Sequence, residues 1–169
     1  MSLKKHENNQ KRNVAIIGCG LIGQSWAISF VSAGFHVSLF DPVEGVTTQA
    51  KEKIEAKLRD LQNYKLLKDK NISDYLDRIH LAEDLSEAVA GSIYVQESGP
   101  EDLNIKKELT KKIDAATPDD IPIASSTSGI STSLYASDIS GKHRCIVAHP
   151  INPPHLIPAV EIVPAPFTS

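Results

Sequence analysis

The sequence predicts an α/β protein with a doubly wound, mostly parallel β-sheet and helices on both faces. Two observations lead to this prediction. Short apolar runs typical of buried strands alternate with segments of helical periodicity, and a GxGxxG motif directly follows the first apolar run. The 169 residues are 41% hydrophobic and 23% charged, as in a soluble domain with a substantial core. We therefore expect one Rossmann-like domain.

The first elements follow a polar N-terminal segment. Residues 1–12 are unpatterned and are expected to be a disordered tail or a tag remnant, which leaves residues 13–169 for the domain. NVAIIG, from Asn13, predicts the first strand. Apolar residues four apart in CGLIGQSWAISFVSAG predict a helix that ends before Gly34. FHVSLFD predicts a second strand that ends at Asp41.

A long amphipathic helix is predicted next, from Val43 to about Lys68, because apolar residues recur every three or four positions. The polar segment DKNISDYLDR reads as a connection. RIHLA predicts a short strand, and Asp84 and Glu87 then resemble the capping box of a small helix.

The last third of the chain repeats the alternation. SIYVQES predicts a strand, and Ser98, Pro100 and Glu101 predict the start of a helix that runs to about Ala116. IPIAS and HRCIVAH predict two further strands, separated by a serine-rich stretch and the short helical segment TSLYASD. After the proline-rich PINPPHLIP, AVEIVP predicts a final strand that suits an antiparallel position.

The glycine motif GCGLIG predicts a phosphate-binding loop. Gly18 permits a tight turn, Gly20 lets the backbone approach a pyrophosphate, and Gly23 lets the helix pack closely on the sheet. The amide groups at the helix N-terminus then face the phosphates. Together with Leu21 and Ile22, these glycines are the predicted cofactor-binding loop.

Asp41 is the predicted ribose-binding acid, because it follows Gly18 by 23 residues and ends the second strand. Its carboxylate would repel a 2′-phosphate, which favours NAD over NADP. The alternative interpretation is a turn aspartate before Pro42. Flavin and S-adenosylmethionine sites use similar loops, so the loop alone does not identify the cofactor.

The predicted catalytic residues follow the last strands. SSTSGISTS and His149 both come directly after strands, where the carboxyl ends of a parallel sheet meet the ligand crevice. Glu161 lies among apolar residues, and a buried glutamate there needs a partner, for which His149 is the candidate. Such a pair is a general base for a substrate hydroxyl, with Ser128 holding the reacting oxygen and a nicotinamide accepting hydride.

The composition and charge of the chain indicate which kinds of partner it can bind. A net charge of −3 gives no indication of nucleic-acid or anionic-membrane binding, and no apolar run is long enough to span a membrane. Two cysteines, Cys19 and Cys145, are too few for a disulfide framework and favour a cytoplasmic protein. No metal site is predicted. A small-molecule substrate is the expected partner.

Four motifs in order, VAIIGCGLIGQSWA, ESGPEDLNIKKEL, SSTS and AHPINPPHLIPAVEIVPAP, resemble the N-terminal NAD-binding domain of the 3-hydroxyacyl-CoA dehydrogenase family. The resemblance runs from Asn13 onward and is closest to the lambda-crystallin branch, which includes L-gulonate 3-dehydrogenase. It implies NAD-dependent oxidation of an L-3-hydroxy group, in either a sugar acid or an acyl-CoA.

The resemblance also implies residue roles. The family's catalytic histidine falls on His149, its partner on Glu161 and the substrate-contacting serine on Ser128. Asn152 occupies the asparagine of the HxxNP pattern, where we expect a substrate contact.

Glu101 and Lys106 match positions near the family's nicotinamide end. From the residues alone, Glu101 also reads as a helix-capping acid and Lys106 as part of a solvated helix face.

Family members continue into a helical domain that closes over the substrate and forms a homodimer, whereas this sequence stops at Ser169. We therefore expect NAD binding but little turnover from this chain alone. The alternatives are a non-catalytic protein, either crystallin-like or NADH-sensing, and a different Rossmann enzyme such as a methyltransferase.

Overall fold

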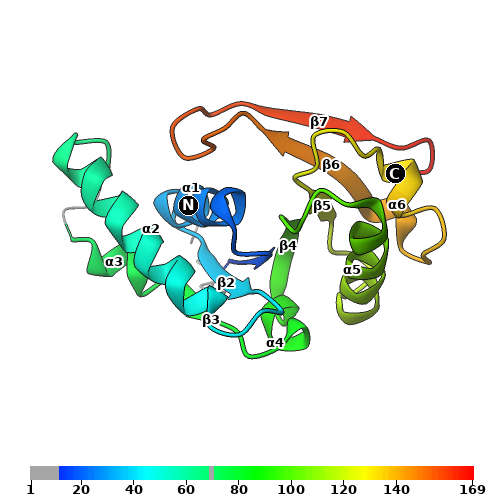
Figure 1. Cartoon of the computed structure of the whole chain (residues 1–169), viewed down its shortest axis with the longest axis horizontal. Coiled ribbons are helices and arrows are strands. Elements are labelled where there is room, and N and C mark those ends of the chain that lie inside the picture. The colour runs from blue at the N-terminus through cyan, green and yellow to red at the C-terminus, as the bar shows by residue number, and fades with distance from the viewer. Residues whose placement is uncertain (1–11, 69–70) are drawn as a thin grey trace, which may run out of the picture.

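A computed structural model describes residues 12–68 and 71–169, so the expected N-terminal tail lies outside the described residues except for its last position. Seven strands form one sheet in the order β3-β2-β1-β4-β5-β6-β7 (Figure 1). Strands β1 to β6 pair in parallel, and β7 is antiparallel to β6. The strands are β1 (Asn13–Ile17), β2 (His36–Phe40), β3 (Ile79–Leu81), β4 (Ser92–Glu97), β5 (Ile123–Ser125), β6 (Cys145–Pro150) and β7 (Val160–Pro164).

Helices cover both faces of the sheet, as predicted. Side chains of β1 alternate between two cores: Val14 and Ile16 pack in the core that contains Trp26, whereas Ala15 and Ile17 pack in the core that contains Ile113. Figure 1 shows α2 and α5 on opposite sides of the sheet. The helices are α1 (Leu21–Ser32), α2 (Val46–Asn63), α3 (Ser73–Leu76), α4 (Leu85–Val89), α5 (Leu103–Ala116) and α6 (Thr132–Tyr135), and a 3₁₀ turn covers Lys142–Arg144.

Two helix starts differ from the sequence prediction. Helix α5 begins at Leu103 rather than near Ser98, because the Asp102 carboxylate accepts the amide hydrogens of Asn104 and Ile105 and so caps the helix there. Helix α2 begins at Val46, three residues later than predicted.

Two other local predictions were incomplete. The segment predicted as a polar connection contains the short helix α3, in which Tyr75 is buried in the core. The capping box of α4 is half formed: Asp84 accepts the amide hydrogen of Glu87, while the Glu87 carboxylate accepts from Glu83 instead of from Asp84.

The strand order creates a crevice between β1 and β4. From β1 the chain continues to β2 on one side, whereas β4 leads to β5 on the other, and ligands of open α/β sheets bind at the carboxyl ends of the strands at such a point. Gly18 follows β1, and Ser98 follows β4.

No helix in the described part of the chain is long and apolar enough to cross a membrane.

Candidate active site

The glycine loop has the geometry that its sequence predicts. Gly18 has a φ of +96°, and a Cβ there would lie 2.6 Å from the carbonyl carbon of Ser98. A Cβ on Gly23 would lie 2.0 Å from the Gly18 carbonyl oxygen, so this glycine allows the helix to approach the loop. Gly20, in contrast, has open space around its Cβ position at the N-terminus of α1, where a ligand backbone can approach.

Two cavities meet at the end of β4. The larger, of about 1010 Å³, has a mainly apolar wall and includes Gly18, Gly20 and Asp41. The smaller, of about 300 Å³, is lined mostly by polar and charged residues, and Ser98 and Gly99 line both. Six of the predicted site residues line the smaller cavity: Ile22, Glu101, Lys106, Ser128, His149 and Asn152. The fold therefore brings these six together beside the glycine loop.

Leu21 lies apart from both cavities. Its side chain is 60% exposed and lines a groove between α1 and α2. Of the residues predicted to bind the cofactor in this loop, Gly18 and Gly20 line the larger cavity and Ile22 lines the smaller one, whereas Leu21 lines neither.

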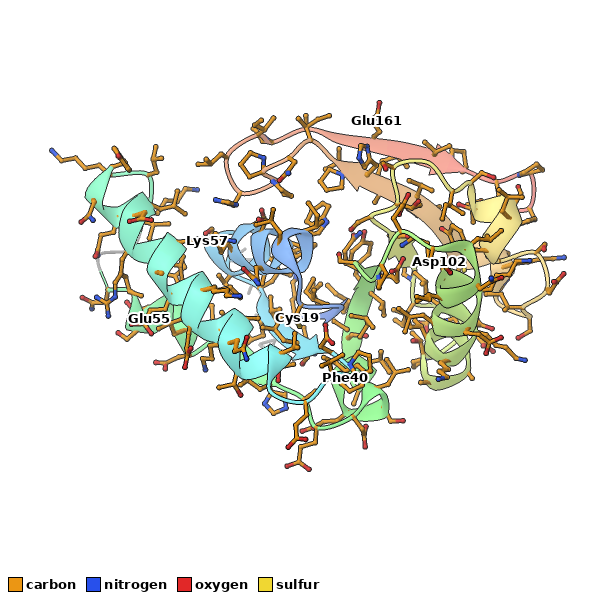
Figure 2. The ribbon with its side chains drawn as sticks, viewed as in Figure 1. Cys19, Phe40, Glu55, Lys57, Asp102 and Glu161 are labelled. Carbon is orange, nitrogen blue, oxygen red and sulfur yellow. The ribbon has the colours of Figure 1, made fainter. Side chains whose placement is uncertain are left out.

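Asp41 holds the glycine loop and also forms a turn. Its Oδ2 accepts the amide hydrogen of Cys19 at 2.9 Å, and its Oδ1 accepts that of Val43 at 3.1 Å. The turn contact that the alternative interpretation requires is therefore present, in a residue that also lines the larger cavity. Burial, and then the nearby Asp41 carboxylate, raise the pKa of the Cys19 thiol, labelled in Figure 2, to about 12, so the thiol stays neutral.

His149 and Glu161 are paired. They lie opposite each other in the β6–β7 ladder, and the His149 Nδ1 is 3.0 Å from the Glu161 Oε2. The expectation that Glu161 is buried is wrong, because its side chain is 67% exposed and the whole of β7 is exposed. Figure 2 labels Glu161 on β7, which is an edge strand. No residue of β7 is buried, so the described elements leave both faces of this strand uncovered, and the Glu161 side chain is therefore exposed.

Glu101 holds the serine-rich loop rather than capping a helix, so its interpretation as a helix-capping acid is wrong. Its Oε1 accepts hydrogen bonds from the Thr127 hydroxyl at 2.6 Å and from the amides of Ser128 and Gly129 at 3.0 Å each. Partial burial alone would raise the pKa of the Glu101 carboxyl, but these hydrogen bonds and the Lys106 ammonium outweigh it and lower the pKa. The ionised carboxylate thus holds the backbone of Ser128.

Lys106 is buried, so the alternative interpretation, in which it belongs to a solvated helix face, is wrong. Its side chain is 1% exposed, and its Nζ lies 3.1 Å and 3.0 Å from the two carboxylate oxygens of Glu97. Glu97 also accepts hydrogen bonds from the Ser125 hydroxyl and the Gly99 amide. Glu97 was not among the predicted site residues, although an acid at the end of an otherwise apolar strand indicates a buried carboxylate that needs a partner.

Metal-binding geometry is not found within residues 12–68 and 71–169: no three His, Cys, Asp or Glu side chains there are grouped to hold an ion. The site thus consists of a glycine loop, a polar cavity and a histidine–glutamate pair.

Comparison with known proteins identifies the family to which the chain belongs. Residues 13–169 match the family described as 3-hydroxyacyl-CoA dehydrogenase, NAD binding domain. The chain is 39% identical to lambda-crystallin from Oryctolagus cuniculus, over 93% of this chain and 50% of that protein. It is 38% identical to L-carnitine dehydrogenase from Streptomyces coelicolor, over 90% and 46%. The chain therefore spans about half the length of the curated relatives it matches.

A solved structure agrees with the family match. The (S)-3-hydroxybutyryl-CoA dehydrogenase from Ralstonia eutropha superimposes with a TM-score of 0.87 at 26% identity, over 94% of this chain and 56% of that one.

Proposed function

Because this chain belongs to the 3-hydroxyacyl-CoA dehydrogenase family, as its NAD-binding domain, we propose that the protein carrying it oxidises an L-3-hydroxy group with His149 as general base. The observation that carries the proposal is the His149–Glu161 pair, in which His149 lines the same cavity as Ser128 beside the glycine loop while Glu161 lies behind it, outside the cavity lining. The substrate is a small hydroxy acid or its acyl-CoA thioester.

The crevice fits NAD. Gly20 leaves open space at the N-terminus of α1, a helix long enough to present its amide groups to a pyrophosphate. The apolar wall of the larger cavity suits an adenine ring, and Asp41 lies where it can accept hydrogen bonds from ribose hydroxyls. The chemistry that bound NAD supplies is hydride acceptance from the substrate carbon.

The protein's own residues handle the proton. Glu161 accepts the Nδ1 hydrogen of His149, which leaves the Nε2 lone pair free to take the proton of the substrate hydroxyl. The carbon that bears this hydroxyl loses hydride at the same time, and the alcohol becomes a ketone. The hydroxyl of Ser128 binds the reacting oxygen, and Glu101 holds the backbone of Ser128 in place. Asn152, which lines the same cavity, contacts the rest of the substrate.

Two substrate classes fit this reaction. The similarity to lambda-crystallin supports a free sugar acid of the L-gulonate type, and the similarity to L-carnitine dehydrogenase supports a free hydroxy acid more generally. The (S)-3-hydroxybutyryl-CoA dehydrogenase neighbour supports an acyl-CoA. A 3-hydroxyacyl-CoA dehydrogenase from Gibberella moniliformis is as similar, at 38% identity over 94% of this chain, so sequence identity does not separate the two classes. We favour the free acid because of the proline-rich segment PINPPHLIP.

NADH binding by this chain, together with rates in the full-length protein, tests the proposal. We expect saturable NADH binding by the chain in calorimetry and little turnover from it, since the relatives are about twice its length. Full-length protein is expected to reduce NAD faster with L-gulonate or L-carnitine than with 3-hydroxybutyryl-CoA. Absence of NADH binding would contradict the assignment, and robust turnover by the chain alone would contradict the expected need for further residues.

Asp41→Asn is expected to weaken the preference for NADH over NADPH. Asn keeps an oxygen for the Cys19 amide but removes the charge that repels a 2′-phosphate, an effect of about 1 kcal/mol in water and more where water is excluded. The NADPH-to-NADH affinity ratio should therefore rise about 5-fold or more in parallel titrations. Asp119→Asn, at an exposed acid after α5, is the control. An unchanged ratio in Asp41→Asn would assign Asp41 to the turn alone.

A non-catalytic crystallin-like or NADH-sensing protein is the second candidate, supported by the lambda-crystallin similarity. It predicts tight NADH binding without turnover in the full-length protein. We further propose a cytoplasmic protein that forms a homodimer and binds neither nucleic acid nor membranes. The exposed apolar side chains of β7, among them Ile162 and Val163, support burial by a further domain or subunit.

A further inference from the structure

The hydroxyl of Ser126 is the centre of a hydrogen-bonded group beside the smaller cavity. Its Oγ lies 3.1 Å from the Trp26 Nε1, 2.8 Å from the Gln96 Nε2 and 2.9 Å from the Ser98 Oγ. These partners come from α1, β4 and the residue after β4, so the group joins both sides of the crevice.

The direction of each hydrogen bond follows from the donors present. An indole N–H and an amide NH₂ can only donate, whereas a hydroxyl oxygen accepts two hydrogen bonds and donates one. The Gln96 amide nitrogen faces Ser126, because the Ala148 carbonyl lies 3.5 Å from it and the Tyr94 hydroxyl donates to the amide oxygen at 2.6 Å. Burial, and then Tyr135, raise the pKa of Tyr94, which keeps that hydroxyl protonated.

Ser126 therefore accepts from Trp26 and Gln96 and must donate its own proton to Ser98. The Ser98 oxygen is then an acceptor in this bond, and its own proton is left over. No group among the described residues accepts that proton. Ser98 is half-buried, lines both cavities and lies against Gly18. An unused O–H donor thus stands in the wall of the crevice.

We propose that Ser98 is a further cofactor-binding residue, whose hydroxyl donates to an acceptor oxygen in the sugar–phosphate portion of NAD. Trp26, Gln96 and Ser126 are positioning residues, which direct the proton of Ser98 toward the cofactor. This inference rests on NAD binding by the domain. It adds a third polar contact with the cofactor to those proposed for the glycine loop and Asp41.

Ser98→Ala tests the contact. A hydrogen bond between neutral partners contributes about 0.5–1.5 kcal/mol, so the dissociation constant for NADH should rise about 2- to 12-fold. Trp26 is the only tryptophan of the chain, and its emission follows the titration alongside calorimetry. Ser86→Ala, at an exposed serine of α4, is the matched control and should leave NADH affinity unchanged.

Trp26→Phe separates positioning from contact. Without the indole N–H, Ser126 has a free acceptor site and Ser98 can donate there instead of to the cofactor. NADH binding, followed by calorimetry, should weaken about 2-fold or more, although Trp26 is not among the residues that line either cavity. In a Ser98→Ala background the same substitution should add no further loss.

The outcomes are distinguishable. Unchanged NADH affinity in folded Ser98→Ala overturns the contact, and additive losses in the double variant overturn the positioning role. Where Trp26→Phe does not fold, as circular dichroism will show, Ser98→Ala alone decides the contact. Failure of the unsubstituted chain to bind NADH would refute the proposed function instead.

Discussion

His149→Gln in the full-length protein should lower turnover by about 10²–10⁴-fold while NADH affinity stays unchanged, because a positioned general base contributes a factor of that size. Glutamine has similar bulk and polarity but cannot accept the substrate proton at neutral pH. Steady-state rates of 3-hydroxy acid oxidation and a calorimetric NADH titration measure the two quantities separately.

Two further variants locate the effect at the pair. Glu161→Gln keeps a hydrogen-bond acceptor near the His149 Nδ1 but removes the charge, so a smaller loss of turnover is expected. His143→Gln changes an exposed histidine of the 3₁₀ turn before β6, and its rate should equal that of the unsubstituted protein. Unchanged turnover in His149→Gln would remove this residue as the base.

Lys106→Met should destabilise the chain by about 3–5 kcal/mol. The substitution keeps an apolar stem of similar length but leaves the Glu97 carboxylate buried without its cationic partner, and breaking a buried ion pair in this way carries a cost of that size. Urea unfolding followed by circular dichroism gives the free energy of unfolding.

The control variants separate loss of the pair from loss of a lysine. Lys107→Met, at the exposed neighbouring position, should change the free energy of unfolding by less than about 0.5 kcal/mol. Adding Glu97→Gln to Lys106→Met should recover part of the loss, because the unpaired charge is then gone. A Lys106→Met variant as stable as the unsubstituted chain would mean that the pair contributes nothing to the fold.

Local sequence properties determined the fold and much of the site. The spacing of apolar residues along the chain distinguishes a strand from a helix and identifies its buried face, and a few neighbouring residues are enough to show that spacing. The need for glycine at Gly23 is equally local, since a Cβ there would meet the carbonyl oxygen of Gly18, and so is the positive φ of Gly18, although a Gly18 Cβ would also meet Ser98 at the end of β4. The pairing of His149 with Glu161 was predictable because the proline-rich residues 151–159 return the chain beside β6, where the two residues face each other in the ladder.

Only the tertiary structure decided which charged and polar groups are buried and what they contact. Lys106 has the spacing of a surface lysine, yet α5 packs it onto Glu97 at the end of β4. Trp26 and Ser126 are 100 residues apart and meet only because α1 and the serine-rich loop flank one crevice. Glu161 is exposed because none of the described elements covers the faces of β7. Burial and long-range contacts depend on which elements stack together, and no local pattern contains that information.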